Sequence, residues 1–153
     1  MNTVRWNIAV SPEVDQSVRM FIAAQGGGRI LLAEDNPVNQ EVGRSFVEIL
    51  GYEVDVVENG VAAVEAARRR RYDLIFMDCQ MPEMDGYQAT AEIRRITANG
   101  RRIPIVALTA NAMQEEAAKC REAGMDDLLA KPYSLEQLQT MMARWVIQAD
   151  TAA

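Results

Sequence analysis

The sequence predicts an α/β fold, doubly wound, in which helices cover both faces of a five-stranded parallel sheet. Short apolar runs alternate with longer amphipathic stretches five times between residues 29 and 148, which is the pattern of β–α units around a parallel sheet. Three of the apolar runs are continuous rather than alternating, as expected for strands that helices bury on both faces. Residues 1–28 precede this repeat and predict a strand-helix extension.

Each of the five units contributes one strand and one helix. The predicted strands are residues 29–34, 52–58, 72–78, 102–110 and 126–131. The predicted helices follow them at residues 36–50, 59–71, 87–98, 111–124 and 134–148. The first, third and fourth strands, RILLAE, YDLIFMD and RIPIVALTA, are the continuously apolar ones.

Caps and stops delimit most of these helices. The first helix is followed by Gly51, a typical stop, and its predicted apolar stripe consists of Val38, Val42, Phe46 and Ile49. The second is rich in alanine, and Asn59 is placed as its cap. The fourth ends at Gly124. The fifth begins with Ser134 and Gln137 in capping-box spacing, and its predicted apolar stripe consists of Leu135, Leu138, Met142 and Trp145.

The first 28 residues are interpreted as a separate segment. Apolar residues alternate over residues 4–10 as in a strand, and residues 11–24 predict a helix that begins with a Ser–Pro pair. The glycines of QGGGR then predict a flexible linker, because ordering them costs much entropy. A phosphate-binding loop is the alternative, but that loop needs a strand before it and a helix after it. The predicted division is an extension and linker at 1–28, one domain at 29–148 and a tail at 149–153.

Composition limits the function classes. A chain of 153 residues can form one domain with a single sizeable core. Its formal charge of −6 argues against non-specific binding to nucleic acid, so no direct nucleic-acid partner is expected. The arginines at 68–71 could contact nucleic acid. Arginines also bind the last carbonyl groups of a helix and balance its dipole, and we favour this second interpretation. Without a signal pattern or an apolar stretch of about 18 residues, we expect a cytoplasmic protein without membrane contact.

Histidine is absent from the chain. Its absence excludes a Ser-His-Asp or Cys-His triad, a His-ligated metal site and a phosphohistidine on this chain. Cys79 and Cys120 form no CxxC motif, so the sequence suggests neither a zinc site nor a disulfide scaffold, and we expect reduced thiols. Any chemistry must therefore rest on carboxylates, hydroxyls and lysine.

Polar residues follow four of the predicted strands, at the edge where doubly wound sheets bind ligands. They are Glu34, Asp35, Asp78, Thr109 and Lys131. Clustered carboxylates repel one another unless a cation lies between them, and a ligand set of oxygens alone favours Mg²⁺. A lysine and a threonine hydroxyl beside such a site fit a phosphoryl group. Asp78 is the best nucleophile, since a carboxylate can form an acyl phosphate; the alternative is that it only caps a turn.

Four motifs in this order and spacing, LLAEDNPVNQ, DLIFMDCQMPEMDG, PIVALTA and KP, make residues 29–148 resemble a two-component response-regulator receiver domain. The amino-acid sequence of these motifs is most similar to that of the receivers of hybrid sensor histidine kinases. The resemblance implies a flavodoxin-like receiver fold and a phosphorelay function. It also implies a partner that carries a phosphohistidine, either a histidine kinase or a histidine phosphotransfer protein.

The resemblance implies a role for each site residue. Asp78 would accept the phosphoryl group. Asp35, Asp78 and the backbone carbonyl of Gln80 would bind Mg²⁺, and Glu34 would bind it through water. Lys131, followed by a cis bond to proline, would contact the phosphoryl group.

The resemblance also implies how the signal is relayed and timed. Thr109 would move to bond a phosphoryl oxygen. Gln80 and Asn111 stand where the family tunes hydrolysis of the acyl phosphate. Leu128 stands where receivers usually carry a Tyr or Phe that moves with the threonine, so the relay is expected to differ here.

Other readings stay open at this point. The chain could be a binding module that works without phosphorylation, which Leu128 favours. It could be a phosphohydrolase with an aspartyl-phosphate intermediate, although such enzymes commonly place an Asp where Gln80 stands. A homodimer is also possible, and the sequence does not decide between a single-domain regulator and a part of a hybrid kinase.

Overall fold

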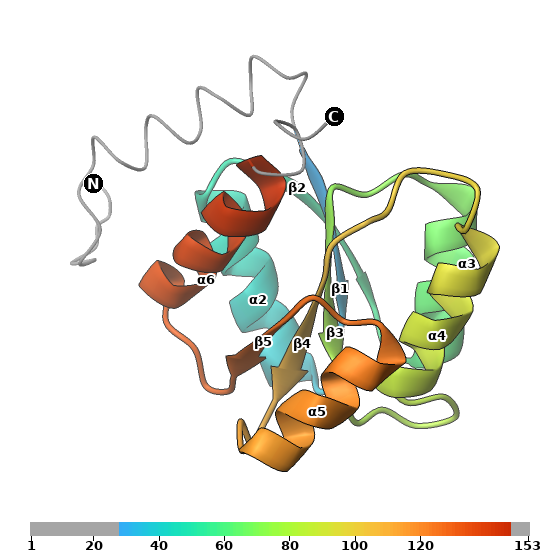
Figure 1. The fold of residues 1–153 in the computed structure, drawn as a ribbon. Coiled ribbons are helices and arrows are strands. Elements are labelled where there is room, and N and C mark those ends of the chain that lie inside the picture. Colours follow the sequence, from blue (N-terminus) through green and yellow to red (C-terminus); the bar gives the residue numbers. More distant parts are fainter. Residues whose placement is uncertain (1–27, 148–153) are drawn as a thin grey trace.

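A five-stranded parallel sheet forms the centre of the molecule (Figure 1). The structure, a computed structural model, describes residues 28–147. Its strands are β1 Arg29–Ala33, β2 Glu53–Val57, β3 Leu74–Asp78, β4 Ile105–Thr109 and β5 Asp127–Ala130. They lie in the order β2-β1-β3-β4-β5, and every neighbouring pair is parallel. This is the flavodoxin-like order, so the predicted fold class is confirmed.

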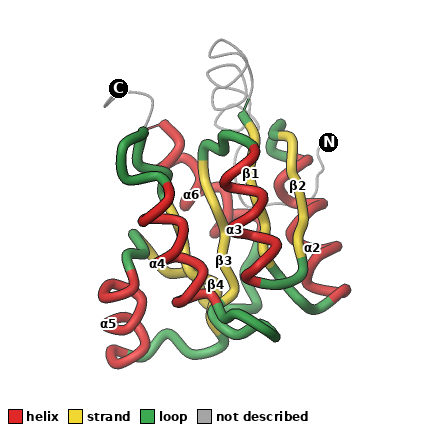
Figure 2. The backbone as a smooth tube through the Cα atoms, turned by 90° about the vertical axis from the view of Figure 1, so that its right-hand side faces the viewer, coloured by secondary structure: helices red, strands yellow, loops and turns green. Residues whose placement is uncertain are grey.

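Helices cover both faces of the sheet. They are α2 Pro37–Ile49, α3 Gly60–Arg69, α4 Gly86–Ile96, α5 Gln114–Ala123, α6 Leu135–Met142 and the π-helical turn η1 Ala143–Ile147. α2 and α6 lie on one face, and α3, α4 and α5 lie on the other (Figure 1 and Figure 2). Among the described helices, none is long and apolar enough to cross a membrane. The predicted strand and helix of the extension and the tail from residue 149 lie outside the described residues.

The central strands are buried on both faces. All five residues of β3 and of β4 are buried. Their side chains alternate between two apolar clusters: Ile75 and Met77 point toward α3, α4 and α5, whereas Leu74 and Phe76 point toward α2 and α6. This two-sided burial explains why these strands read as continuous apolar runs. It also leaves their carboxyl ends as the place where polar side chains can gather.

Most predicted caps and stops are confirmed. Asn59 caps α3, with its side chain accepting a hydrogen bond from the third residue of the first turn. Ser134 and Gln137 form the capping box of α6. Gly51 and Gly124 follow α2 and α5 with φ angles of 94° and 105°, the left-handed region that favours glycine.

At the start of three helices the predicted range only adds the capping residue, whereas two helix starts differ in another way. α4 begins at Gly86, one residue early, because Asp85 and Gln88 form a capping box. α5 begins at Gln114 rather than at residue 111. The reason is that the backbone N–H and C=O of Asn111 are both bound to the Thr109 hydroxyl, which holds this residue outside the helix.

The predicted apolar stripe of α2 is wrong in three of its four members. Val38 is 70% exposed, and Val42 and Ile49 are each 40% exposed. α2 buries Gly43 and Val47 instead, and Gly43 lets it approach β1 so closely that a Cβ there would lie 2.7 Å from Leu32 Cδ2. Phe46, the fourth member, is half-buried and packs edge-on against Tyr133.

The predicted apolar stripe of the last helix is confirmed. Leu135, Leu138 and Met142 are buried, and Trp145, which lies in η1, packs against the same cluster. The sequence pattern did not distinguish the π-helical turn from a continuation of α6.

Candidate functional site

A cleft of about 420 Å³ opens at the carboxyl ends of the strands. Its lining includes all five residues that the sequence placed at strand ends, Glu34, Asp35, Asp78, Thr109 and Lys131. Gln80 and Asn111 line it as well. The structure therefore brings together every predicted site residue except Leu128. The sheet does this because parallel strands end at one edge, whatever the distance between them in the sequence.

Asp78 lies at the tip of β3 with only 4% of its surface exposed. One carboxylate oxygen accepts a hydrogen bond of 3.2 Å from the Gln80 backbone N–H. The other lies 3.1 Å from the Lys131 ammonium. Its backbone is held by close packing, because a Cβ on Gly86 would lie 2.2 Å from the Asp78 carbonyl oxygen. The carboxylate is thus buried, partnered and fixed in position.

Glu34 is the second buried acid of the cleft. Its carboxylate accepts a hydrogen bond of 3.1 Å from the Asn36 N–H and lies 3.3 Å from the Lys131 ammonium. Burial, followed by the charge of Asp78, raises the pKa of Glu34 above its usual value. Asp35 is exposed, yet a carboxylate oxygen from each of the three acids lies within 4.8 Å of the other two.

Lys131 follows β5 and bridges the two buried acids. Burial opposes its charged form, but the carboxylates of Asp78 and Glu34 outweigh burial and raise the pKa of Lys131. Its bond to Pro132 is cis, as predicted. The ammonium is therefore held in its charged state against the carboxylates of Asp78 and Glu34.

Thr109 and Leu128 differ in their relation to the cleft. The Thr109 hydroxyl donates to the Asn111 carbonyl and accepts from the Asn111 N–H, both at 3.0 Å. Leu128 lies outside the cleft, half-buried against the apolar cluster under α3, α4 and α5.

The donor set fits a hard divalent cation. Three carboxylates face one ammonium, so the cleft carries an excess of negative charge. The pKa of Glu34 is raised partly for this reason, and a cation would relieve that repulsion. The candidate ligands are all oxygens, and the exposed Asp35 leaves room for water, which suits Mg²⁺.

The structure also brings residues to the cleft that sequence reasoning missed. Glu116 reaches it from α5, and the Tyr87 hydroxyl of α4 donates a hydrogen bond to the Glu116 carboxylate. Cys79 lines the cleft too, and its sulfur lies 4.0 Å from that of Cys120. Glu116 and Cys120 are four residues apart, a spacing that places them on one helix face. That spacing was the available signal.

The arginine run at 68–71 lies at the end of α3 and lines a second cavity of about 410 Å³, together with Arg101. Arg69 pairs with Glu65 one turn earlier, and Arg70 lies 3.7 Å from Asp55. These pairings agree with the interpretation that the arginines stabilise the C-terminus of α3 rather than bind nucleic acid.

Comparison with known proteins identifies a family that agrees with the fold and the cleft. The family model of the response regulator receiver domain matches residues 30–143. A ribbon-helix-helix domain model matches residues 1–34, most of which lie outside the described residues.

Two curated relatives are a sensor protein and a probable histidine kinase. The sensor protein GacS of Pseudomonas syringae pv. syringae is 46% identical over 119 residues, which cover 76% of this chain and 13% of that protein. The probable histidine kinase 1 of Oryza sativa subsp. indica is 36% identical over 148 residues, covering 77% of this chain and 15% of that protein. The chain therefore spans a small part of the relatives it matches.

Two solved structures are similar over most of the chain. The receiver domain of the sensor histidine kinase PA1611 from Pseudomonas aeruginosa PAO1, with a magnesium ion in its active site cleft, is 53% identical with a TM-score of 0.73, covering 78% of this chain and 98% of that one. The receiver domain of the response regulator Ssk1, in complex with the histidine phosphotransfer protein Ypd1 of Saccharomyces cerevisiae, is 32% identical with a TM-score of 0.75, covering 80% and 92%. With this fold, this cleft and a family model that spans most of its length, the chain belongs to the family of response regulator receiver domains.

Proposed function

We propose that Asp78 accepts a phosphoryl group from the phosphohistidine of a partner, in a reaction that requires Mg²⁺. The observation that carries this proposal is the environment of Asp78: a buried carboxylate at a strand tip, 3.1 Å from an ammonium and within 4.8 Å of two further acids. A pair of buried acids beside a third, exposed one has no evident structural use, because burying charge is costly. This arrangement of acids and an ammonium suits the binding of a metal ion and a phosphoryl group at the same time.

The transfer consists of one substitution at phosphorus. A carboxylate oxygen of Asp78 attacks the phosphorus, the bond from phosphorus to the histidine nitrogen breaks, and that nitrogen keeps the electron pair. Mg²⁺, held by Asp35, Asp78 and the Gln80 carbonyl with Glu34 acting through water, would neutralise charge on the phosphoryl oxygens. Lys131 holds a positive charge against the same group from the side of β5.

After transfer, Thr109 would exchange its bonds to Asn111 for a bond to a phosphoryl oxygen. This exchange would release the start of α5 and alter the surface presented to partners. Gln80 and Asn111 would modulate attack of water on the acyl phosphate, and their position in the lining of the cleft supports this proposal. The chain then acts as a signalling module that catalyses its own phosphorylation and dephosphorylation.

The partner is proposed to be a histidine kinase or a histidine phosphotransfer protein. The similarity to the Ssk1 receiver domain supports this, since that protein is solved in complex with a phosphotransfer protein. A homodimer and a cytoplasmic location remain predictions. The mass of the chain in solution, with and without a phosphoryl mimic, tests the first of these.

The decisive experiment is phosphorylation by a small phosphodonor, read out by intact mass. We expect one phosphoryl group per chain with Mg²⁺, none with a chelator and none in Asp78→Asn. Glu48→Gln, an exposed acid on α2, is the control that should leave labelling unchanged. Stoichiometric labelling of Asp78→Asn would contradict the proposal.

Each of the two alternative functions predicts a different experimental result. Many turnovers of a phosphate ester per chain would favour a phosphohydrolase. Equal affinity of the natural chain, its phosphorylated form and Asp78→Asn for the partner would favour a binding module that works without phosphorylation.

A further inference from the structure

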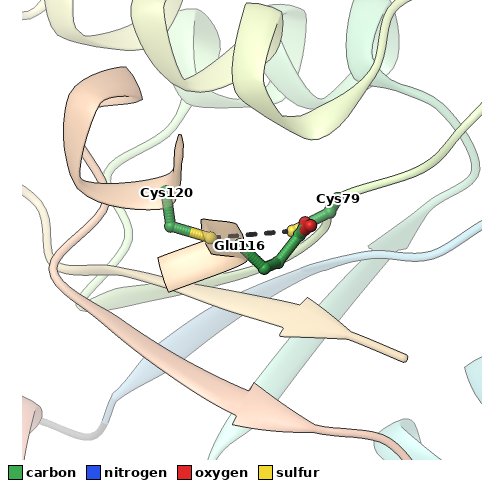
Figure 3. Close-up of side chains that lie close together, drawn as sticks. All are labelled: Cys79, Glu116 and Cys120. Carbon is green, nitrogen blue, oxygen red and sulfur yellow. Dashed lines mark hydrogen bonds between the residues drawn. The ribbon is translucent and has the colours of Figure 1, made fainter. Parts of the chain in front are cut away.

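Three metal-ligating side chains meet beside the cleft, and none of them belongs to the proposed Mg²⁺ site (Figure 3). Cys79 follows β3, while Glu116 and Cys120 lie one turn apart on α5. The two sulfurs are 4.0 Å apart. A sulfur from each cysteine and a carboxylate oxygen of Glu116 all lie within 4.8 Å of one another.

The two thiols form a hydrogen bond to one another, and the spacing of their sulfurs fits a shared metal ion but not a disulfide. A disulfide needs the sulfurs at about 2.05 Å, roughly half the observed distance. Two thiolates on a tetrahedral zinc ion, each bonded at about 2.3 Å, lie about 3.8 Å from one another. The observed 4.0 Å is close to the zinc value, so the ion could bind with small side-chain movements.

The surroundings provide both access and orientation. Cys79 and Cys120 are buried, but Cys79 and Glu116 line the cleft, which opens a route for an ion from solvent. The Tyr87 hydroxyl donates a hydrogen bond to Glu116, and the Lys119 ammonium lies 4.8 Å from the centre of the Tyr87 ring. Such outer contacts orient a ligating carboxylate and strengthen metal binding.

We propose that Cys79, Glu116 and Cys120 bind Zn²⁺, with water in the fourth position. Both thiols lose their protons to solvent as the two zinc–sulfur bonds form. Sulfur donors select Zn²⁺ over Mg²⁺, whereas the oxygen donors of the neighbouring acid cluster suit Mg²⁺ and leave excess Mg²⁺ able to occupy it. The two sites are therefore distinct although Cys79 adjoins Asp78 in the chain.

Zinc at this site also has a consequence for the proposed phosphorylation, and this consequence rests on the proposed function. The ion would tie the segment after β3 to α5, the helix that follows Thr109. We expect bound Zn²⁺ to slow labelling of Asp78. Zinc binding itself is measured separately, so failure of the phosphorylation proposal would leave the zinc proposal standing.

The test is a titration of the reduced full chain with Zn²⁺ in excess Mg²⁺, which keeps the acid cluster occupied. We expect one Zn²⁺ per chain and an affinity at least tenfold lower in Cys120→Ser and in Glu116→Gln. Glu115→Gln, the exposed neighbour on α5, and Asp35→Asn should bind Zn²⁺ as the natural chain does. Co²⁺ in place of Zn²⁺ should give the charge-transfer absorption of thiolate ligation, a readout that does not depend on any variant folding.

Three results would overturn the proposal. One is the absence of Zn²⁺ binding or of the Co²⁺–thiolate band in the natural chain. Another is loss of Zn²⁺ binding in Asp35→Asn but not in Cys120→Ser, which would place the ion in the acid cluster. The third is formation of a disulfide between Cys79 and Cys120 while Zn²⁺ is present, shown by a loss of two hydrogens in the intact mass.

Discussion

Lys131 balances much of the charge in the cleft. Its ammonium lies 3.1 Å from Asp78 and 3.3 Å from Glu34, both of them buried. A hydrogen bond to a charged group contributes about 1.5–3 kcal/mol. The same ammonium can therefore hold Asp78 in place before the reaction and a phosphoryl oxygen during it.

Replacing Lys131 with alanine should separate phosphoryl transfer from metal binding. We expect Lys131→Ala to be phosphorylated about 10- to 100-fold more slowly, the range that a lost charged hydrogen bond of this strength implies. Its affinity for Mg²⁺ should not fall, because removing a positive charge leaves the acid cluster more negative. Labelling rates from a small phosphodonor and a Mg²⁺ titration measure the two effects.

The control for this prediction is Lys119→Ala, since Lys119 is the other lysine of the chain and is exposed on α5. It should be labelled at the natural rate. If Lys131→Ala lost Mg²⁺ affinity and labelling to the same extent, the assignment of Lys131 to the phosphoryl group would be wrong.

At the scale of elements, the start of α4 is packed directly on the backbone of Asp78. A Cβ on Gly86 would lie 2.2 Å from the Asp78 carbonyl oxygen and 3.0 Å from the Cys79 Cα. The Gly86 N–H also donates to the Cys79 carbonyl at 3.0 Å. Because the opposing atoms are backbone, no side-chain rotation can make room.

Gly86→Ala should therefore shift α4 against the tip of β3. We expect a loss of about 2 kcal/mol in the free energy of unfolding, the usual size of an overpacking effect, and slower labelling of Asp78. Gly100→Ala is the matched control, because the nearest atom to its added Cβ is 3.8 Å away. Urea unfolding compares the two, and equal losses would show that the clash at Gly86 is relieved.

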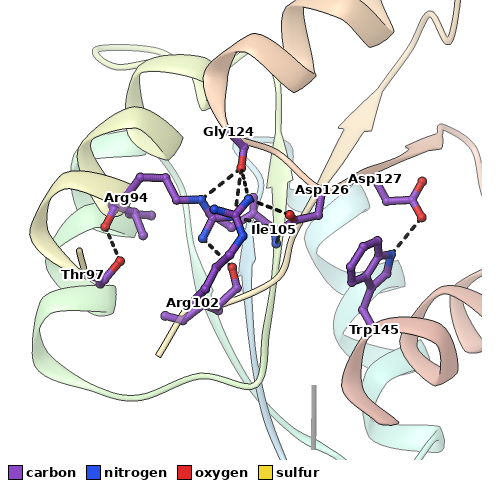
Figure 4. A network of polar contacts seen from close by, with 10 residues as sticks. Arg94, Thr97, Arg102, Ile105, Gly124, Asp126, Asp127 and Trp145 are labelled. Atoms are coloured by element: carbon purple, nitrogen blue, oxygen red, sulfur yellow. Dashed lines mark hydrogen bonds and ion pairs between the residues drawn. The ribbon is translucent and has the colours of Figure 1, made fainter. Parts of the chain in front are cut away.

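Arg94 of α4 connects three neighbouring segments (Figure 4). Its guanidinium donates to the carbonyls of Ile103 and Gly124 and pairs with Asp126 at 2.8 Å. Asp126 in turn accepts the backbone N–H of Ile105 at 2.9 Å. The Arg94 and Asp126 side chains are only 15% and 13% exposed, so this is a largely buried pair that joins α4, the end of α5 and β4.

Removing one partner of a buried pair leaves the other charge uncompensated. We expect Arg94→Ala to lower the free energy of unfolding by about 3 kcal/mol, even though Arg102 still pairs with Asp126. Arg95→Ala, which removes an exposed pair with Glu92 on the same helix, should leave the urea midpoint unchanged. If both variants unfolded at the natural midpoint, the Arg94 contacts would not contribute to stability.

Across the whole molecule, the sequence predicts the fold and the cleft well for one physical reason. Continuous apolar runs identify strands buried on both faces, and strand ends in a parallel sheet converge. Asp78, Thr109 and Lys131 could therefore be placed in one cleft from their positions alone. The threonine and lysine are 31 and 53 residues beyond Asp78 in the chain, yet all three line the cleft.

Contacts between side chains of different elements could not be predicted in the same way. The buried face of α2 depends on the close approach that Gly43 permits, which hydrophobic spacing does not express. The pairing of Cys79 with Cys120 joins residues 41 apart, and that of Arg94 with Asp126 joins residues 32 apart. Neither pair forms a local motif. Cys79 meets Cys120 because α5 packs beside the end of β3, and Asp126, which follows α5, meets Arg94 because α4 and α5 are neighbours.

The charge of the cleft also affects the stability of the whole domain. Glu34, Asp35 and Asp78 repel one another in the folded chain, whereas unfolding separates Asp78 from the other two. A cation that binds the folded chain alone stabilises it, by about 2.7 kcal/mol when its concentration is 100 times the dissociation constant. The proposed Mg²⁺ site should therefore be visible as a change in thermal stability.

Mg²⁺ should raise the unfolding temperature of the natural chain, with an increase that grows with the logarithm of its concentration above the dissociation constant. In Asp35→Asn the increase should be largely lost, because a proposed direct ligand of Mg²⁺ is gone. The same variant should unfold slightly above the natural chain in a chelator, because one of three repelling charges is removed. Circular dichroism melts of both proteins measure this, with Glu48→Gln as the exposed control. An equal response of Asp35→Asn and the natural chain to Mg²⁺ would mean that the ion stabilises the domain elsewhere than at the acid cluster.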